Sequence, residues 1–173
     1  MILEGVAKVN IRIATGVDMQ ALVDIYNQAI AVGQRTADTE LVTLEGRREW
    51  FESHPPAQYP LLVAEKDNII VGYLTISAYR AGRLALRHTA EVSYYIHFDY
   101  HRQGVGSRLV QYAIELCPSI QIKSLIAILM DCNQGSIALL EKHGFKEWGH
   151  MPKIADYDGL EVGQLYYGLR VEF

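Results

Sequence analysis

The chain contains little cysteine, which excludes a fold that depends on disulfides. Its 173 residues include two cysteines, Cys117 and Cys132, and no CxxC spacing. Disulfide scaffolds need a larger set of cysteines, and CxxC pairs are typical of metal or redox sites. We therefore expect two reduced thiols in an intracellular protein.

Long hydrophobic runs are also missing. The longest apolar runs, such as Ile69–Gly72 and Leu125–Met130, are far shorter than the roughly 18 residues that a membrane span needs. The N-terminal sequence MILEGVAKVN lacks the charged segment and apolar run of a signal peptide. We therefore expect a cytoplasmic protein with no membrane partner.

Positive charge is not in excess. The chain carries 16 Lys and Arg against 20 Asp and Glu, for a formal net charge of −4. A protein that binds nucleic acid needs a basic face to displace counterions from the phosphates, so no nucleic-acid partner is expected. A small basic pocket for one phosphorylated ligand remains compatible with this balance.

The chain does have a large apolar fraction. Half of its residues are hydrophobic, which excludes an intrinsically disordered protein. Its length fits one domain with its own core, because domains run to roughly 100–200 residues. We expect this domain over residues 10–173, preceded by an N-terminal extension over residues 1–9.

Hydrophobic periodicity predicts alternating strands and helices. Residues 124–130 form an almost continuous apolar run, which is typical of a strand covered on both faces. Strands are expected over residues 10–14, 59–65, 69–77, 89–97, 124–130, 145–151 and 164–171, and helices begin near Thr15, Thr43, Gly104 and Asn133. At the first of these helices, Thr15 and Asp18 are expected to form a capping box. This order predicts an α/β architecture, with a mixed sheet and helices on its faces.

The strongest local motif lies where the strand ending near His97 turns into the next helix. Gly104 and Gly106 open that helix, and Arg102 and Arg108 add positive charge. Successive backbone N–H groups at a helix start bind anions, and glycine lets a phosphate approach closely. The motif therefore predicts a phosphate site, although an ordinary strand-to-helix turn could contain the same residues.

This motif does not match two common classes of nucleotide-binding loop. A dinucleotide fingerprint needs a third glycine where the chain has Leu109, and a Walker loop needs a lysine between Gly106 and Ser107. Phosphate binding of another kind remains open.

A second motif follows the buried strand. Asn133-Gln-Gly-Ser136 begins the last helix, and Gly144-Phe145 ends it; Asn133 alone would be read as a helix cap. Together with the glycine turn, this order resembles the GCN5-related N-acetyltransferase (GNAT) family from about Asn10 to Val171. The segments Ile25-Tyr-Asn27, Thr36–Glu40 with Trp50-Phe51, and Arg83–Glu91 are similar to its phosphinothricin acetyltransferase group.

The resemblance implies a fold and a ligand. It implies a single domain whose mostly antiparallel sheet has a splayed central pair of parallel strands, with helices on both faces. Acetyl-CoA would lie in the splayed gap as co-substrate, with no metal. The implied cofactor-binding residues are Tyr94, Tyr95, Ile96, Arg102, Gln103, Gly104, Val105, Gly106, Ser107, Asn133 and Ser136. His101 departs from the family's glycine motif at its first position, and Arg102 is expected to supply the charge instead.

The resemblance also implies the catalytic groups. Glu91 matches the family's glutamate and would take a proton from the acceptor amine, because a protonated amine cannot attack. A backbone N–H near Tyr95 would stabilise the tetrahedral oxyanion. Leu140 occupies the position where relatives often carry a Tyr or His acid, so no general acid is assigned.

Acceptor recognition is expected on loops. Arg83, Arg87 and Thr89 resemble residues beside the acceptor, and arginine binds carboxylates through paired hydrogen bonds. Asn27 and Thr36 are expected in the same pocket, where the acidic neighbours of Thr36 would instead suit a cationic acceptor. Arg83 and Arg87 could also belong to a solvated basic loop.

The resemblance thus implies an acetyl-CoA-dependent N-acetyltransferase. The acceptor would be a small amino-acid-like amine, such as phosphinothricin or methionine sulfoximine, which attacks directly in a ternary complex. A peptide or protein N-acetyltransferase and a non-catalytic acetyl-CoA sensor remain the alternatives. His97 and His101 have a metal-ligand spacing but lie at a strand end and in a loop, so no metal is expected. By the resemblance, we expect a homodimer.

Overall fold

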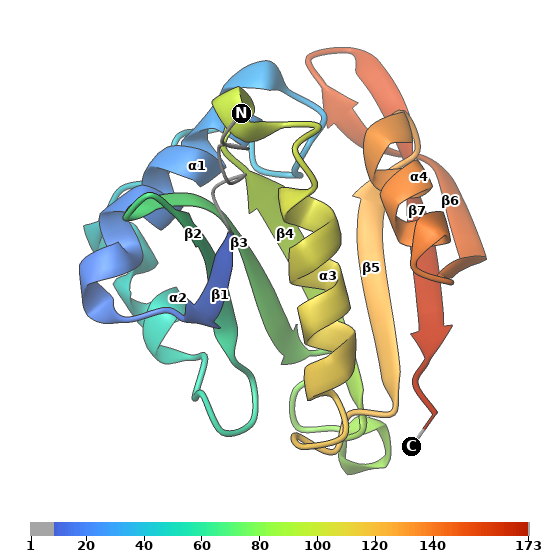
Figure 1. Cartoon of the computed structure of the whole chain (residues 1–173). Coiled ribbons are helices and arrows are strands. Elements are labelled where there is room, and N and C mark those ends of the chain that lie inside the picture. The colour runs from blue at the N-terminus through green and yellow to red at the C-terminus, as the bar shows by residue number, and fades with distance from the viewer. Residues whose placement is uncertain (1–8, 173) are drawn as a thin grey trace, which may run out of the picture.

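A computed structural model describes residues 9–172. It contains one seven-stranded sheet in the order β1-β2-β3-β4-β5-β7-β6, in which β4 and β5 are the parallel pair and the other neighbours are antiparallel (Figure 1). The strands are β1 (Asn10–Ile13), β2 (Leu61–Lys66), β3 (Ile69–Ala78), β4 (Thr89–Ile96), β5 (Ser124–Met130), β6 (Lys146–Tyr157) and β7 (Leu160–Arg170). The helices are α1 (Met19–Val32), α2 (Arg48–Glu52), α3 (Val105–Leu116) and α4 (Gln134–Lys142). The α/β prediction is confirmed.

Helices cover both faces of the sheet. On one face, α3 packs its apolar stripe, including the buried Leu109 and Ala113, into a core that also holds Leu74 and Leu125. On the other face, α1 packs against β2 and β3 in a second core. Burying each large aliphatic side chain contributes about 1.5–3 kcal/mol, so the two cores hold the layers together. We call these the α3 face and the α1 face.

The start of α1 is fixed by a charged cluster. The capping box predicted at Thr15 is present, and the Thr15 N–H donates to the Asp18 carboxylate at 2.7 Å. Arg12 on β1 donates to both Asp18 oxygens, at 2.8 and 2.9 Å, and to Glu65 on β2. The Arg12 guanidinium lowers the pKa of Asp18, so this cluster ties α1 to the sheet as a paired carboxylate.

The predicted splay lies in the middle of the sheet. β4 and β5 pair over four positions, from Thr89 opposite Ser124 to Val92 opposite Ala127. Beyond Val92, β4 continues to Ile96 paired only with β3, and β5 continues to Met130 paired only with β7. A gap therefore opens between the carboxyl ends of the two central strands.

The C-terminal hairpin is longer than predicted. The predicted strands end at 151 and begin at 164, whereas β6 and β7 run to a two-residue turn at Asp158 and Gly159. Register shifts between Glu147 and Gly149 and between Met151 and Ala155 break the alternation in β6, which hid the strand in the sequence.

The proposed N-terminal extension lies mostly outside the described residues. Residues 1–8 are outside them, and Val9 is buried in the core of the α3 face. Within residues 9–172, no helix is both long and apolar enough to cross a membrane.

Candidate active site

The gap exposes one edge of the β4 backbone. The Thr89 carbonyl accepts from the Tyr79 N–H, and the His97 N–H donates to the Val71 carbonyl, so odd-numbered residues of β4 bond to β3. Antiparallel pairing alternates, so Tyr95 turns its N–H toward β3, whereas the N–H groups of Tyr94 and Ile96 face the gap. The donor predicted near Tyr95 is therefore available on these two neighbours.

The Tyr94 and Tyr95 side chains lie on opposite faces of the sheet. On the α3 face, the Tyr94 hydroxyl hydrogen-bonds to the Ser136 hydroxyl near the start of α4. Burial raises the pKa of Tyr94 to about 12, so this hydroxyl stays protonated at neutral pH. On the α1 face, the Tyr95 ring packs 5.5 Å from that of Tyr73 and 4.9 Å from that of Tyr26. Two predicted cofactor residues, Tyr94 and Ser136, are thus brought together beside the gap.

The turn before α3 has an anion-binding geometry. Arg102 and Gly104 have positive φ angles of 59° and 80°, and a Cβ on Gly104 would meet no atom within 4 Å. The N–H groups of residues 102–107 donate to no acceptor in the described part of the chain. They gather at the start of a twelve-residue helix, whose dipole favours negative charge there.

Other residues of this motif have structural roles. A Cβ on Gly106 would come within 2.8 Å of a Leu139 methyl group, so glycine lets α3 and α4 pack here without a shift of that side chain. The His101 Nε2 lies 2.9 Å from the Ile96 carbonyl oxygen and hydrogen-bonds to it. Val105 is buried in the core, so only its backbone can reach a ligand. The Gln103 side chain bonds to the Asp99 carbonyl.

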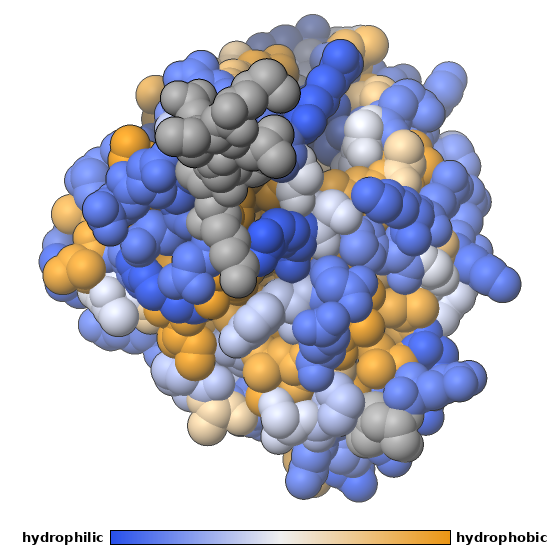
Figure 2. Space-filling view, viewed as in Figure 1, coloured by the Kyte–Doolittle hydropathy of each residue, from blue (hydrophilic) through white to orange (hydrophobic). Residues whose placement is uncertain are grey.

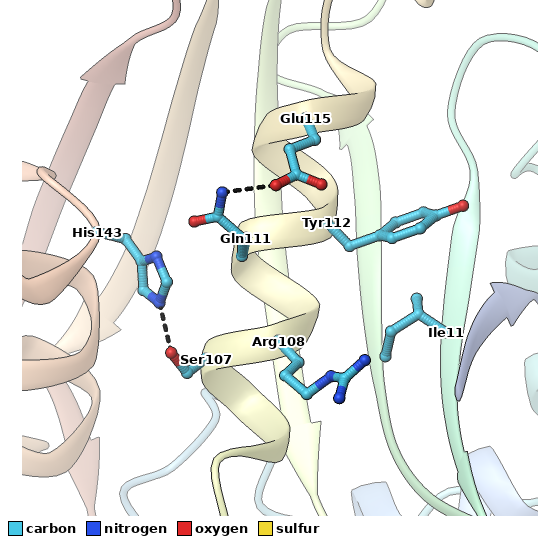
Figure 3. Close-up of a pocket in the computed structure, with 7 residues that line it drawn as sticks. All are labelled: Ile11, Ser107, Arg108, Gln111, Tyr112, Glu115 and His143. Carbon is cyan, nitrogen blue, oxygen red and sulfur yellow. Dashed lines mark hydrogen bonds between the residues drawn. The ribbon is translucent and has the colours of Figure 1, made fainter. Parts of the chain in front are cut away.

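A groove runs along the outer side of α3, next to this turn (Figure 3). The Ser107 hydroxyl and His143 Nε2 lie 2.8 Å apart, which joins the start of α3 to the end of α4. On the other side of α3, Arg108 points toward Ile11. The α3 face is mostly hydrophilic, and apolar surface shows over β5 beside α4 (Figure 2). Arg108 thus adds a cation beside the turn.

Asn133 caps α4 and contacts a loop from the opposite face. Its Oδ1 accepts from the Ser136 N–H at 3.3 Å and from the Arg35 guanidinium at 2.8 Å. Gln34 lies beside Cys132, with Oε1 and Sγ 3.5 Å apart. The loop that follows α1 therefore reaches the end of β5. Sequence reasoning missed Arg35, whose partner is 98 residues away.

Glu91 lies on the α1 face near the point where the central strands separate. It is opposite Ser77 on β3 and Ile126 on β5, one position before the last β4–β5 pair. The side chain is half-buried, and its carboxylate accepts no hydrogen bond from any described residue. Burial raises the pKa of Glu91, because desolvation disfavours the charged form. A less solvated carboxylate is a stronger base toward an amine.

Ser77, which is opposite Glu91, and its partner His54 were not predicted. His54 is buried after α2, with Nδ1 2.7 Å from the Trp50 carbonyl oxygen and Nε2 3.0 Å from the Ser77 hydroxyl. A carbonyl only accepts, so Nδ1 carries the proton and Nε2 accepts from Ser77. Burial lowers the pKa of His54, which keeps it neutral. No sequence pattern marked this pair, since the two residues meet only through the fold.

The predicted acceptor residues divide into two groups. Arg83 and Arg87 are exposed in the loop before β4, where Thr89 begins the strand, at the end opposite the α3 turn (Figure 1). Asn27 bonds through both amide atoms to the Val42 backbone at 2.9 Å. Thr36 is buried, and its hydroxyl lies 2.6 Å from that of Tyr26. Asn27 and Thr36 therefore hold the loop after α1 in place.

Two further positions bear on the chemistry. Leu140, at the position where an acid was sought, is buried in the core of the α3 face. No group of three or more His, Cys, Asp or Glu in residues 9–172 is arranged to hold a metal ion.

Comparisons with known proteins agree with this geometry. The model of the acetyltransferase (GNAT) family matches residues 19–145. A Bacillus subtilis (strain 168) protein named "Putative phosphinothricin acetyltransferase YwnH" is 45% identical over 150 residues, which cover 86% of this chain and 91% of that protein. The Escherichia coli (strain K12) L-amino acid N-acyltransferase MnaT is 30% identical over 94% of each chain.

The fold is shared with a solved structure that contains the expected co-substrate. An acetyltransferase structure from Salmonella typhimurium, described "with its cofactor Acetyl-CoA", has a TM-score of 0.90 and 25% sequence identity, and the match covers 96% of each chain. The family match spans well over half of the chain. The chain is therefore a member of the GNAT family of N-acetyltransferases.

Proposed function

We propose that the protein transfers the acetyl group of acetyl-CoA to the amine of a small amino-acid-like acceptor, such as phosphinothricin or methionine sulfoximine. The names of the relatives point to this acceptor class. One observation carries the proposal: Glu91 is a half-buried carboxylate with a raised pKa at the point where the central strands separate, on the strand whose Tyr94 and Ile96 N–H groups face the gap.

The residues around the gap fit acetyl-CoA. The N–H groups of residues 102–107 would bind the pyrophosphate, and Arg102 and Arg108 would add charge. The gap-facing edge of β4 would pair with the amides of the pantetheine arm, as an added strand pairs with an exposed edge. Asn133 and Ser136 would contact the arm from α4. The residues proposed for binding are Tyr94, Tyr95, Ile96, Arg102, Gln103, Gly104, Val105, Gly106, Ser107, Asn133 and Ser136.

Glu91 would act as the general base. It takes the proton from the acceptor amine, directly or through one water, and the neutral amine attacks the thioester carbon. The Tyr94 N–H, next to Tyr95, would donate to the oxyanion that forms. The C–S bond then breaks, and the thiolate leaves with a proton from water, because Leu140 cannot supply one. No covalent acyl-enzyme is required.

Arg83, Arg87 and Thr89 would receive the acceptor at the amino end of β4. Two exposed guanidiniums in the loop just before Glu91 suit the carboxylate of an amino acid. Asn27 and Thr36 would shape the pocket indirectly, by fixing the loop after α1.

We also propose a homodimer and a cytoplasmic location. The edge strand β6 and the first residue of β7 expose apolar side chains, which favours burial against a second copy. These side chains are Trp148, Met151, Ile154 and Leu160. Cys132 is a free, exposed thiol, which suits a reducing compartment.

Thiol release from acetyl-CoA tests the proposed activity. The amines to compare are phosphinothricin, methionine sulfoximine, free amino acids, polyamines and short peptides. We expect thiol release with an amino-acid analogue. Release with peptides alone would indicate a peptide acetyltransferase. No thiol release with any of these amines, together with tight CoA binding, would indicate a non-catalytic sensor and contradict the proposed activity.

A further inference from the structure

Arg47 is an ordered arginine on the α1 face that neither the sequence nor the family motif singled out. It ends the short 3-10 helix Glu45–Arg47 before α2. Its guanidinium carbon lies 4.2 Å from the centre of the Tyr26 ring and 4.7 Å from that of the Trp50 ring. Two aromatic faces therefore fix the position of a guanidinium whose side chain is only 19% exposed.

The donors of this guanidinium are unused. No residue in the described part of the chain accepts a hydrogen bond from the Arg47 side chain, and the nearest carboxylate oxygen, on Asp38, is 4.0 Å away. That oxygen already accepts from the Tyr26 hydroxyl at 2.7 Å. No buried side-chain nitrogen among residues 9–172 lacks a partner, so the Arg47 nitrogens must reach water. Arg47 is thus a fixed cation that is accessible to a ligand.

Two chains of contacts connect Arg47 to the reaction centre. On one side, the Trp50 ring lies 5.2 Å from that of His54, which bonds to Ser77, the residue opposite Glu91. On the other side, the Tyr26 ring packs on Tyr95, which lies on the same strand face as Glu91.

Between these two chains of contacts, the sheet carries small polar side chains. Thr75 pairs with Ser93 on β4, between the Tyr73–Tyr95 and Ser77–Glu91 pairs. Thr75 is only 6% exposed, yet its hydroxyl has no partner in the part of the chain that is described. Since no such oxygen among the described residues is sealed from water without a partner, this hydroxyl is in contact with solvent. Along the sheet, Thr75 therefore lies between Glu91 and the Tyr73 and Tyr95 rings, against which the two rings that hold Arg47 pack.

We propose that Arg47 binds an oxyanion of the acceptor while Glu91 takes the proton from its amine. The inference rests on the proposed function, since it names the residue that selects the acceptor. The oxyanion is either the α-carboxylate or an acidic group at the end of the side chain, such as a phosphinate. A guanidinium suits both, because its paired N–H groups match the two oxygens of either group.

Acceptor kinetics with matched variants test this role. Arg47→Met removes the charge, whereas Arg47→Lys keeps the charge but loses the paired N–H groups of the guanidinium. Arg48→Met is the control, because Arg48 is exposed and paired with Glu45. For phosphinothricin, we expect Arg47→Met to raise KM on the order of 100-fold with little change in kcat, as for the loss of charged hydrogen bonds. Arg47→Lys should have a smaller effect, and Arg48→Met none.

Truncated acceptors identify the oxyanion. Phosphinothricin α-carboxamide lacks the carboxylate, and 2-aminopentanoate lacks the phosphinate. The acceptor that lacks the bound group should respond least to Arg47→Met. Equal losses with all three acceptors would indicate a merely structural arginine and overturn the proposal. Normal KM values in Arg47→Met, with the loss found instead in Arg83→Met or Arg87→Met, would also overturn it and leave the proposed function intact.

A binding measurement separates this proposal from the activity. Trp50 and Trp148 are the two tryptophans, so a Trp148→Phe background reports Trp50 fluorescence alone. Phosphinothricin should change that emission, and Arg47→Met should shift the titration to about 100-fold higher concentration. A fluorescence response without acetylation would support Arg47 and contradict the proposed function. No response with intact Arg47 would overturn the Arg47 proposal itself.

Discussion

Substituting Gly104 with valine separates the anion site from the stability of the fold. Gly104 has φ +80° and open space where a Cβ would lie, so the cost of Gly104→Val to folding is conformational. A non-glycine residue in the left-handed region costs about 1–2 kcal/mol. For a chain of this length, this free energy corresponds to a drop in Tm of roughly 2–8 °C.

The same change should reduce CoA affinity much more than it reduces stability. The valine side chain would project into the open space beside the free N–H groups of residues 102–107. If it displaces the phosphate from two of them, about 3 kcal/mol is lost at 1.5 kcal/mol for each hydrogen bond to a charged group. That loss corresponds to a rise in Kd of more than about 100-fold.

Gly159→Val is the matched control. Gly159 has φ +92° and lies in the β6–β7 turn, and a Cβ at this position would meet no atom within 4 Å. Both variants should lose similar Tm in thermal unfolding, whereas calorimetric titration with CoA should show weaker binding in Gly104→Val alone. Equal Kd values in the two variants would refute the assignment of the turn as the pyrophosphate site.

Three further predictions concern catalysis and stability. Glu91→Gln should lower kcat about 10²- to 10⁴-fold and leave the affinity for CoA unchanged. In the unsubstituted enzyme, kcat/KM should fall as the pH drops through the raised pKa of Glu91. A flat pH profile would exclude Glu91 as the base. Asp18→Asn should reduce the unfolding free energy by about 2 kcal/mol at pH 7. Because Arg12 lowers the pKa of Asp18, denaturant titrations should show the full loss above about pH 4 and no loss at lower pH. A loss that is independent of pH would contradict this role of Asp18. Leu140→Ala should cost about 2–5 kcal/mol through a core cavity and leave the activity of the folded fraction intact, whereas a large fall in kcat would give Leu140 a chemical role.

The sequence predicted the parts of the fold that depend on local periodicity. The strand at 124–130, the helix opened by Gly104 and the capping box at Thr15 all carry short-range patterns, and all three are present. The full length of β6 could not be predicted, because its register shifts break the alternation on which strand prediction relies.

The candidate site was predictable only where one segment carries it. Glu91 and the turn before α3 belong to continuous motifs. Which N–H groups face the gap depends on the register of β4 with β3, which no single segment determines. His54 meets Ser77, and Arg47 meets Tyr26, only through the packing of segments distant in the chain, so no spacing in the sequence could indicate them.

The central claim is direct acetyl transfer to a small amine. Acetyl-CoA labelled with ¹³C in the acetyl group, incubated with the protein and phosphinothricin, tests it through mass spectrometry of both the acceptor and the protein. The account predicts the label on the acceptor nitrogen, one for each CoA released, and none bound covalently to the protein. Label retained on the protein, or an unlabelled acceptor despite CoA binding, would contradict it.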